Sequence, residues 1–210
     1  MSHDYIDCIL DFETLDFRPT SCVVDFSVVF FNSGKEYSYK ELLDKVYYWK
    51  FDLNHQITTY GRTVDQNTLD WWEKQSQEAK AVLTPTTDDV SITRFIKELQ
   101  EVFVKEGVST KSLMYSRGSD FDFPILKSIA EQADRTIDIR NFPTPFWNIK
   151  DLRSVIGGYL GNPLMHTYAI PKEETPGFIK HDSRHDVAHA AYMLMKCRRP
   201  WARRLKYINT

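Results

Sequence analysis

The stretch YIDCILDFETLDFRPTSCVVDFSVVFF, residues 5–31, decides the fold. Within it, residues 5–10 and 22–31 are apolar, β-branched and aromatic runs bounded by polar residues, which is the pattern of buried strands. A proline-containing connection at residues 18–21 separates the two runs, and a third run of the same kind covers residues 46–53. Three strands joined this closely predict an antiparallel meander.

The rest of the chain alternates between helical and strand patterns. We expect helices at residues 65–76, 77–83, 88–105, 124–133, 151–159 and 183–197, and short strands at residues 112–116 and 146–149. The glycine pair at residues 157–158 and Pro200 are expected to end the last two helices. This order places an antiparallel unit beside parallel strands with crossover helices. It predicts an α/β fold with a ribonuclease-H-like mixed five-stranded sheet flanked by helices, in one domain spanning residues 1–210.

The composition excludes several classes of protein and indicates a cellular location. The chain has 210 residues, of which 42% are hydrophobic and 27% charged, and this excludes a disordered, collagen-like or coiled-coil protein. Its three cysteines show no C-x-x-C spacing, which argues against a disulfide framework or a cysteine zinc site and favours a reducing compartment. The N-terminus lacks a signal-peptide pattern and no apolar run approaches a membrane span. We therefore expect a soluble, cytoplasmic protein with no membrane partner.

The net charge of −2 hides an uneven distribution. Residues 187–210 contain no acid but carry Lys196, Arg198, Arg199, Arg203, Arg204 and Lys206. Two interpretations stay open for this basic segment: a solvated helix end whose charges complement the helix dipole, or a surface that follows nucleic-acid phosphates.

Acidic residues gather at three places that the predicted sheet brings to one edge. Asp11 and Glu13 stand two apart at the end of the first strand, so both side chains point to the same face. Asp122 follows the fourth strand in the block SRGSDFDFPIL, and Asp186 lies on the first turns of the last helix, in HDSRHDVAHA. Each acid has a plain structural explanation, such as the helix cap that we expect Asp120 to form.

Taken in order, these residues resemble the three motifs of the DEDDh 3′-to-5′ exonucleases: Asp11-x-Glu13, Phe121-Asp122, and His181 followed five positions later by Asp186. TLDWWEKQS at residues 68–76, the SRGSDFDFPIL block and NIKDLRSV at residues 148–155 are similar to the phage DexA exonucleases and the related exodeoxyribonuclease VIII group. The resemblance spans nearly the whole chain. The sequence departs from the wider family at Asp16, where a D-x-E-T-x-G pattern has glycine, and at Gly118, where many members have asparagine.

The resemblance implies a metal-dependent 3′-to-5′ exodeoxyribonuclease that uses two Mg²⁺ or Mn²⁺ ions to release 5′ mononucleotides from single-stranded DNA 3′ ends, in the host cytoplasm if the protein is of phage origin. Phosphodiester hydrolysis needs an activated water and relief of charge at phosphorus, and hard cations of this kind take oxygen ligands. By the same resemblance, Asp11 bridges both ions, Glu13 and Asp186 hold the ion that activates water, and Asp122 serves the second ion. His181 accepts the proton of the attacking water, a role that suits a side chain titrating near pH 7.

Substrate contacts are expected next to these groups. The resemblance places Thr14 and Leu15 in the turn that receives the terminal nucleotide. Trp71 and Trp72 point about 100° apart on a helix, so only one can lie fully in the core, and the other either packs the helix down or offers a base-stacking face. Arg117 is either a solvated strand-end charge or a phosphate contact.

Three alternatives stay open. The first is a 3′-to-5′ exoribonuclease of the same fold, since relatives of the DexA group include RNA-trimming enzymes. The second is a catalytically inactive nucleic-acid-binding module, whose mark would be a lost metal ligand. The third is a zinc site of His181, His185 and His189, which recur every fourth position but would leave the other acids without a role.

Overall fold

A five-stranded sheet forms the centre of the computed structural model, which describes the backbone of residues 5–208 and the side chains of residues 5–198. Its strands are β1 (Ile6–Thr14), β2 (Val23–Asn32), β3 (Tyr47–Lys50), β4 (Met114–Ser116) and β5 (Ile149–Asp151), in the order β3-β2-β1-β4-β5. The pairs β1–β2 and β2–β3 are antiparallel, whereas β1–β4 and β4–β5 are parallel. The predicted meander and mixed sheet are therefore confirmed.

Helices surround this sheet and most begin at a side-chain cap. They are α1 (Tyr39–Leu43), α2 (Leu53–Tyr60), α3 (Gln66–Glu73), α4 (Gln77–Lys80), α5 (Ile92–Lys105), α6 (Asp122–Ala133), α7 (Leu152–Leu160) and α8 (Ser183–Ile208), with 3₁₀ turns at Ala81–Leu83, Phe146–Asn148 and Lys172–Glu174. At α5, for example, the Ser91 hydroxyl accepts a hydrogen bond from the Arg94 N–H. None of the helices in the described part of the chain is long and apolar enough to span a membrane.

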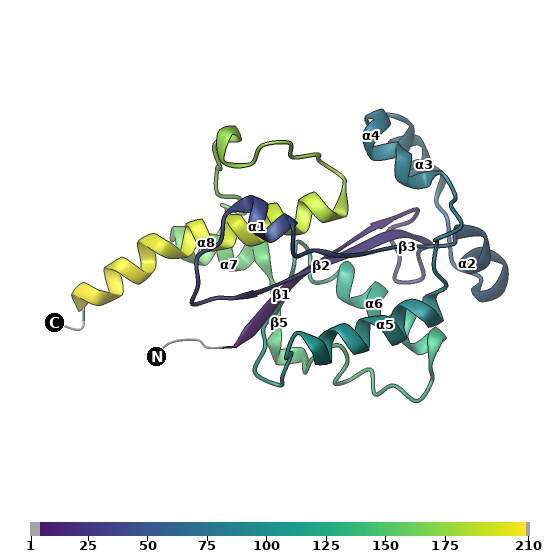
Figure 1. Cartoon of the computed structure of the whole chain (residues 1–210), viewed down its shortest axis with the longest axis horizontal. Coiled ribbons are helices and arrows are strands. Elements are labelled where there is room, and N and C mark those ends of the chain that lie inside the picture. The colour runs from purple at the N-terminus through teal and green to yellow at the C-terminus, as the bar shows by residue number, and fades with distance from the viewer. Residues whose placement is uncertain (1–4, 209–210) are drawn as a thin grey trace.

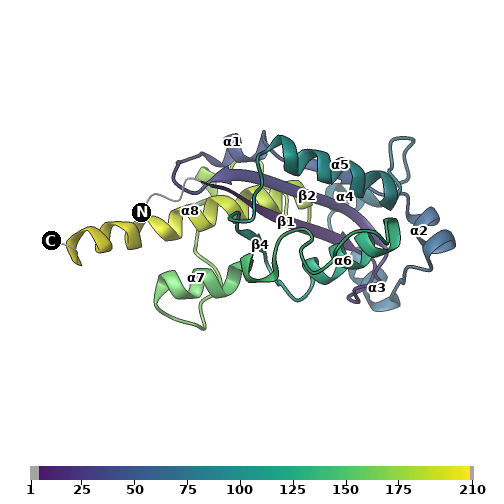
Figure 2. The same ribbon diagram turned by 90° about the horizontal axis from the view of Figure 1, so that it is seen from below.

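Helices cover both faces of the sheet (Figures 1 and 2), and an apolar cluster lies between the sheet and each layer of helices. On one face, Leu10 and Phe12 of β1 pack with α5 and α6. On the other, Ile9 and its neighbours pack with α1, α7 and α8. Because successive strand residues alternate between faces, Asp11 and Glu13 continue the face of Ile9, which is the face that α8 covers.

A third apolar cluster closes the end of the sheet where β1 stops. Leu15 packs there with Cys22, Val24, Trp72 and Ala79. The Trp72 indole N–H also donates to the Thr14 carbonyl at 2.9 Å. The α3–α4 unit is thereby fastened to the end of β1 and stands beyond the strand ends (Figure 1).

The structure corrects two expected strands. The third run ends at Lys50, and the residues from Leu53 begin α2, because the Asp52 side chain caps this helix by accepting from the His55 N–H. Residues 146–148 form a 3₁₀ turn, so the last strand begins only at Ile149.

Three expected helix ends are also wrong. The glycines at 157–158 lie inside α7, which ends at Gly161 in the left-handed conformation with φ +68°. The backbone of α8 continues past Pro200 to Ile208. Asp120 caps nothing, because the cap position of α6 is Phe121 and no side chain bonds there. In the C-terminal basic segment, the side chains of Arg199, Arg203, Arg204 and Lys206 lie outside the described residues.

Candidate active site

The centre of the site is the C-terminal end of β1. Asp11 is partly buried there and Glu13 is 9% exposed. Both project from the face on which Ile9 contacts the cluster containing Val187 and Ala188 of α8. The strand thus carries its two acids to the point where α8 begins.

Asp122 reaches the same place from α6. The Phe12 backbone N–H, between the two acids of β1, donates to Asp122 Oδ1 at 3.1 Å. Asp122 is only 2% exposed, and this contact joins residues 110 positions apart. A hydrogen bond to a buried carboxylate compensates part of its desolvation, so it fixes the start of α6 against β1.

His181 and Asp186 come from the turn that leads into α8. His181 adopts the left-handed backbone conformation, with φ +64°, and its N–H donates to Asp186 Oδ2 at 2.9 Å. Its Nδ1 lies 3.9 Å from Glu13 Oε1. One ligand atom from each of Glu13, His181 and Asp186 lies within 4.8 Å of the others, so these three can share an ion.

The helix start is itself anchored to the sheet. Ser183, the first residue of α8, is fully buried and its hydroxyl lies 2.8 Å from the Ser27 hydroxyl on β2. Because α8 begins two residues after His181, this contact sets the height of His181 and Asp186 above β1.

Crowded, buried carboxylates shift one another's titration. Burial, followed by repulsion from Asp122, Glu13 and Asp186, raises the pKa of Asp11 well above its usual range. Burial raises the pKa of Asp122 to about 7, although the Phe12 N–H opposes the rise, and it raises the pKa of Asp186 to about 6. Carboxylate oxygens that repel one another until a cation neutralises them are suitable ligands for a hard divalent metal ion. The chemistry of these residues therefore fits such an ion.

Asp25 adds an acid that the sequence interpretation did not include. It lies opposite Glu13 in the β1–β2 register, is 2% exposed, and its Oδ1 has no hydrogen-bond partner among the described residues. Burial raises its pKa to about 7, and its charge helps raise the pKa of Glu13. A signal was present in the sequence, because an acid interrupts the otherwise apolar run CVVDFSVVFF.

Trp71 and Trp72 lie in different environments, as their adjacent positions on a helix predict. Trp72 is 1% exposed in the core, whereas Trp71 is 38% exposed and meets the His181 ring edge-on, with 4.8 Å between centroids. Trp71 therefore forms a wall of the site, and Trp72 has no face left for a substrate. Burial, with a smaller effect from Lys180, lowers the pKa of His181, so its neutral form dominates at neutral pH.

The turn after Glu13 is closed by side-chain hydrogen bonds. Thr14 Oγ1 donates to the Asp16 carbonyl at 2.7 Å, and Leu15 is buried. Asp16, which replaces the family's glycine, accepts from the Phe17 N–H at 2.7 Å and from Arg18 Nη1 at 2.9 Å. This turn is further held by Arg62, which is 3% exposed and donates to the Ser21 carbonyl.

Arg117 lies beside the carboxylates, where it interacts attractively with Asp186 and Asp11. Burial and the neighbouring Arg153 lower the pKa of Arg117. Arg153 was not among the residues that the sequence singled out.

The histidines do not form a zinc site in the described part of the chain. His185 Nδ1 lies 2.7 Å from the Tyr39 hydroxyl, and His189 packs against Phe178 with 4.7 Å between ring centroids. His181 precedes α8, as the sequence interpretation held, and it faces Glu13 instead of the other histidines.

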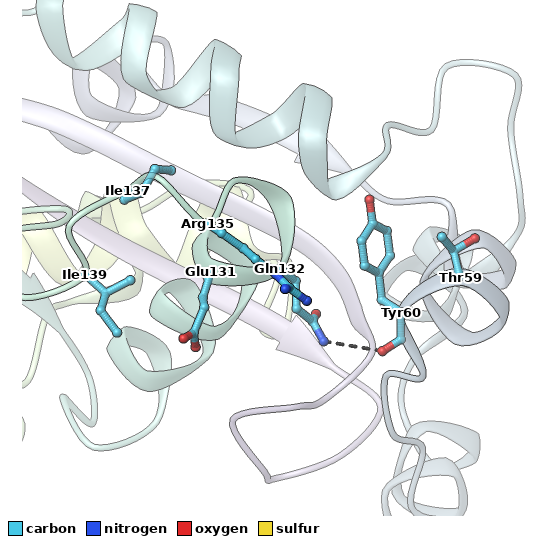
Figure 3. Close-up of a pocket in the computed structure, with 7 residues that line it drawn as sticks. All are labelled: Thr59, Tyr60, Glu131, Gln132, Arg135, Ile137 and Ile139. Atoms are coloured by element: carbon cyan, nitrogen blue, oxygen red, sulfur yellow. Dashed lines mark hydrogen bonds between the residues drawn. The ribbon is translucent and has the colours of Figure 1, made fainter.

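Two cavities lie in different parts of the surface, and one of them adjoins the carboxylates. A cavity of about 240 Å³ next to the carboxylates is lined by Asp25, Tyr48 and His181 among others. A larger one, about 690 Å³, lies between the end of α2 and the end of α6, where Gln132 Nε2 donates to the Tyr60 carbonyl at 3.3 Å (Figure 3). The larger cavity contains none of the clustered acids, so size alone does not mark the functional site here.

A mixed sheet that gathers an Asp-x-Glu pair, an aspartate from a following helix and a histidine–aspartate pair defines a 3′-to-5′ exonuclease of the DEDDh type, a hydrolase with a ribonuclease-H-like fold. The chain belongs to the family described as 3′-5′ exoribonuclease Rv2179c-like domain, whose model matches residues 7–197. All of the motif residues are present, so the lost metal ligand that would mark an inactive binding module is not found in the sequence.

Among individual proteins, the chain is similar to an exodeoxyribonuclease of Enterobacteria phage T4, with 32% identity over 199 residues that cover 90% of this chain and 87% of the relative. Solved structures with the same fold include product-bound exonuclease I (TM-score 0.55, 15% identity, 97% of this chain and 46% of that one). Cell-death related nuclease 4 also has it (TM-score 0.56, 14% identity, 92% and 64%). The chain therefore spans less than half of exonuclease I and under two thirds of the second nuclease.

Proposed function

We propose that residues 1–210 form a single metal-dependent 3′-to-5′ exodeoxyribonuclease domain of the DexA-like group, which removes 5′ mononucleotides from single-stranded DNA. The observation that carries the proposal is the clustering of Asp11, Glu13, Asp122 and Asp186 with His181 at the end of one strand. The phage T4 relative, named an exodeoxyribonuclease, supports DNA as the substrate.

Two Mg²⁺ or Mn²⁺ ions are the proposed cofactors. Asp11, Glu13, Asp122 and Asp186 would hold them, because their buried oxygens repel one another and carry raised pKa values in the absence of a cation. When bound, such ions supply positive charge for the phosphorane and lower the pKa of water.

His181 is the proposed general base. Its ring stands between Glu13 and Trp71, so its orientation is restricted on both sides. The lowered pKa leaves an imidazole nitrogen unprotonated at neutral pH, ready to accept the proton of an attacking water.

Trp71, Thr14, Leu15 and Arg117 are the proposed substrate contacts. Trp71 presents an exposed ring beside His181, on which a terminal base can stack. Thr14 and Leu15 would bound the terminal nucleotide through the turn that Asp16 closes. Arg117 would contribute positive charge to the substrate phosphate.

RNA is the second candidate substrate. The matching family is described as an exoribonuclease, which favours RNA, whereas the T4 relative favours DNA. The 2′-hydroxyl is read by shape and by backbone contacts, so no single motif decides between them.

The test compares DNA and RNA oligonucleotides of one sequence, labelled at the 5′ end, in Mg²⁺, Mn²⁺ or EDTA. We expect a ladder of products shortened from the 3′ end on DNA, no reaction in EDTA, strong slowing by a 3′-phosphate, and resistance of circular single strands. The variant D11N should be inactive, whereas D120N, which changes an exposed acid two residues before Asp122, should behave as the wild type. Efficient cutting of circular single strands would refute the proposed exonuclease activity. A large preference for the RNA oligonucleotide would identify RNA, and not DNA, as the substrate.

The cytoplasm of a bacterial host is the proposed location. The phage origin of the T4 relative supports it, and so do Cys8, Cys22 and Cys197, which are buried free thiols.

A further inference from the structure

Two arginines stand at the same edge of the sheet as the acids. Ile9 of β1 pairs with Tyr115 of β4, so Arg117, two residues on, is level with Asp11. Ser116 pairs in turn with Asp151 of β5, which places Arg153, in the first turn of α7, level with Gly118, the residue next to Arg117 along the chain. The parallel register therefore sets two guanidinium groups next to the carboxylate cluster.

Gly118 makes room for the second arginine. A Cβ atom built on Gly118 would lie 3.3 Å from Arg153 Nη1, closer than most side-chain contacts, and Gly118 has φ +129°, which side chains rarely adopt. Arg153 thus lies directly over the turn that leads from β4 into α6. This contact gives a physical reason for glycine where many related sequences have asparagine.

Neither guanidinium has an anionic partner of its own. Among the residues whose side chains are described, neither Arg117 nor Arg153 forms a hydrogen bond or an ion pair through its guanidinium group. They act on the acids from a distance: Arg153 opposes the rise that burial causes in the pKa of Asp122, and Arg117 opposes the same rise in the pKa of Asp186. Both also attract Asp151. Two like charges held side by side, near acids but hydrogen-bonded to none of them, suit a ligand with several anionic oxygens.

We propose that Arg117 and Arg153 together bind the backbone phosphate that precedes the scissile one on its 5′ side. The inference rests on the proposed exonuclease activity. A strand that ends in a free 3′-hydroxyl brings one phosphate to the metal ligands when its terminal nucleotide is removed, so every other phosphate lies on the 5′ side. A pair of guanidinium groups can bind a phosphodiester without contacting the sugar, so this subsite would bind DNA and RNA alike.

The experiment pairs a protein change with a matching substrate change. Arg153→Ala is compared with wild type on an oligonucleotide with natural linkages and on one with a neutral methylphosphonate at the second linkage from the 3′ end. We expect KM to rise about tenfold for either change alone, with a smaller effect on kcat, since a charge-assisted hydrogen bond is lost in each case. Combining both changes should add little, because they remove the same contact.

Controls distinguish the loss of this phosphate contact from a general loss of activity. A methylphosphonate placed several linkages away should leave the tenfold effect of Arg153→Ala intact, Arg153→Lys should restore part of the loss, and the exposed Arg135→Ala should match wild type. Additive losses in the combined experiment, an unchanged KM, or a loss confined to kcat would overturn the proposal. If wild type releases no mononucleotides with Mg²⁺ or Mn²⁺, the exonuclease proposal itself fails and this one falls with it.

Discussion

Replacing Asp122 by asparagine should stabilise the metal-free protein at alkaline pH while it abolishes activity. Asparagine keeps an oxygen that can accept from the Phe12 N–H, so the contact at 3.1 Å can survive and only the charge is removed. Burial raises the pKa of Asp122 from 3.8 to about 7, a difference of about three pH units. At roughly 1.4 kcal/mol per unit, the buried charge costs up to about 4 kcal/mol of folding free energy above pH 7.

The sign follows from the direction of the shift. Because the folded state holds the proton of Asp122 more tightly than the unfolded state, the penalty is absent below about pH 4, grows as the pH rises and is complete above about pH 7. Neighbouring acids share the repulsion, so we expect D122N to gain on the order of 2 kcal/mol at pH 8 and little at pH 4. Added Mg²⁺ should reduce or reverse the gain, since the wild type binds the ion better.

Urea unfolding in EDTA at pH 4, 6 and 8 measures this difference directly. The exposed D120N removes the same charge two residues away and should show no pH-dependent gain. A D122N protein that is less stable than wild type at pH 8, or equally stabilised at all three pH values, would refute the assignment of Asp122 to a strained carboxylate cluster.

Further predictions concern the reaction and the walls of the site. Asp11→Ala should abolish nuclease activity without lowering the melting temperature, because it also relieves carboxylate repulsion; retained turnover would contradict its role as a metal ligand. His181→Ala should lose about 10² to 10⁴ in rate while metal binding measured by calorimetry survives, and the wild-type rate should rise with pH with a midpoint below the ordinary histidine value; an unchanged pH profile would remove His181 from the mechanism. Trp72→Ala should cost about 3 to 5 kcal/mol in denaturant unfolding, whereas Trp71→Ala should raise KM with little change in stability; the opposite pattern would exchange their roles.

The features that were predictable from sequence rest on short-range periodicity. Alternation along β1 is enough to place Asp11 and Glu13 on one face, and a long run of mostly apolar, β-branched and aromatic residues is enough to identify β2. The motif order then indicates that Asp122 and Asp186 should join them. Where two signals overlapped, the prediction failed: the run 46–53 crosses the Asp52 cap, which ends the strand region and begins α2.

Other features depend on contacts between distant residues. The edge-on contact of Trp71 with His181 joins α3 to the turn before α8, and nothing local to either segment specifies it. The burial of Asp25 reflects packing beneath α8, and the approach of Arg153 to Gly118 follows from the β4–β5 register. Such contacts form only when separate elements pack together, so local patterns in a single sequence do not specify them directly.

The contact between β1 and α8 means that the reactive centre is divisible. Asp11, Glu13 and Asp122 all precede the long, mostly exposed connection between α7 and α8, whereas His181 and Asp186 follow it. Neither portion holds the complete set of proposed ligands, and Val187, Ala188 and Ala191 give α8 a fully buried apolar face that packs on the sheet. The site is therefore completed only when the chain, after passing through this connection, packs α8 back onto the sheet.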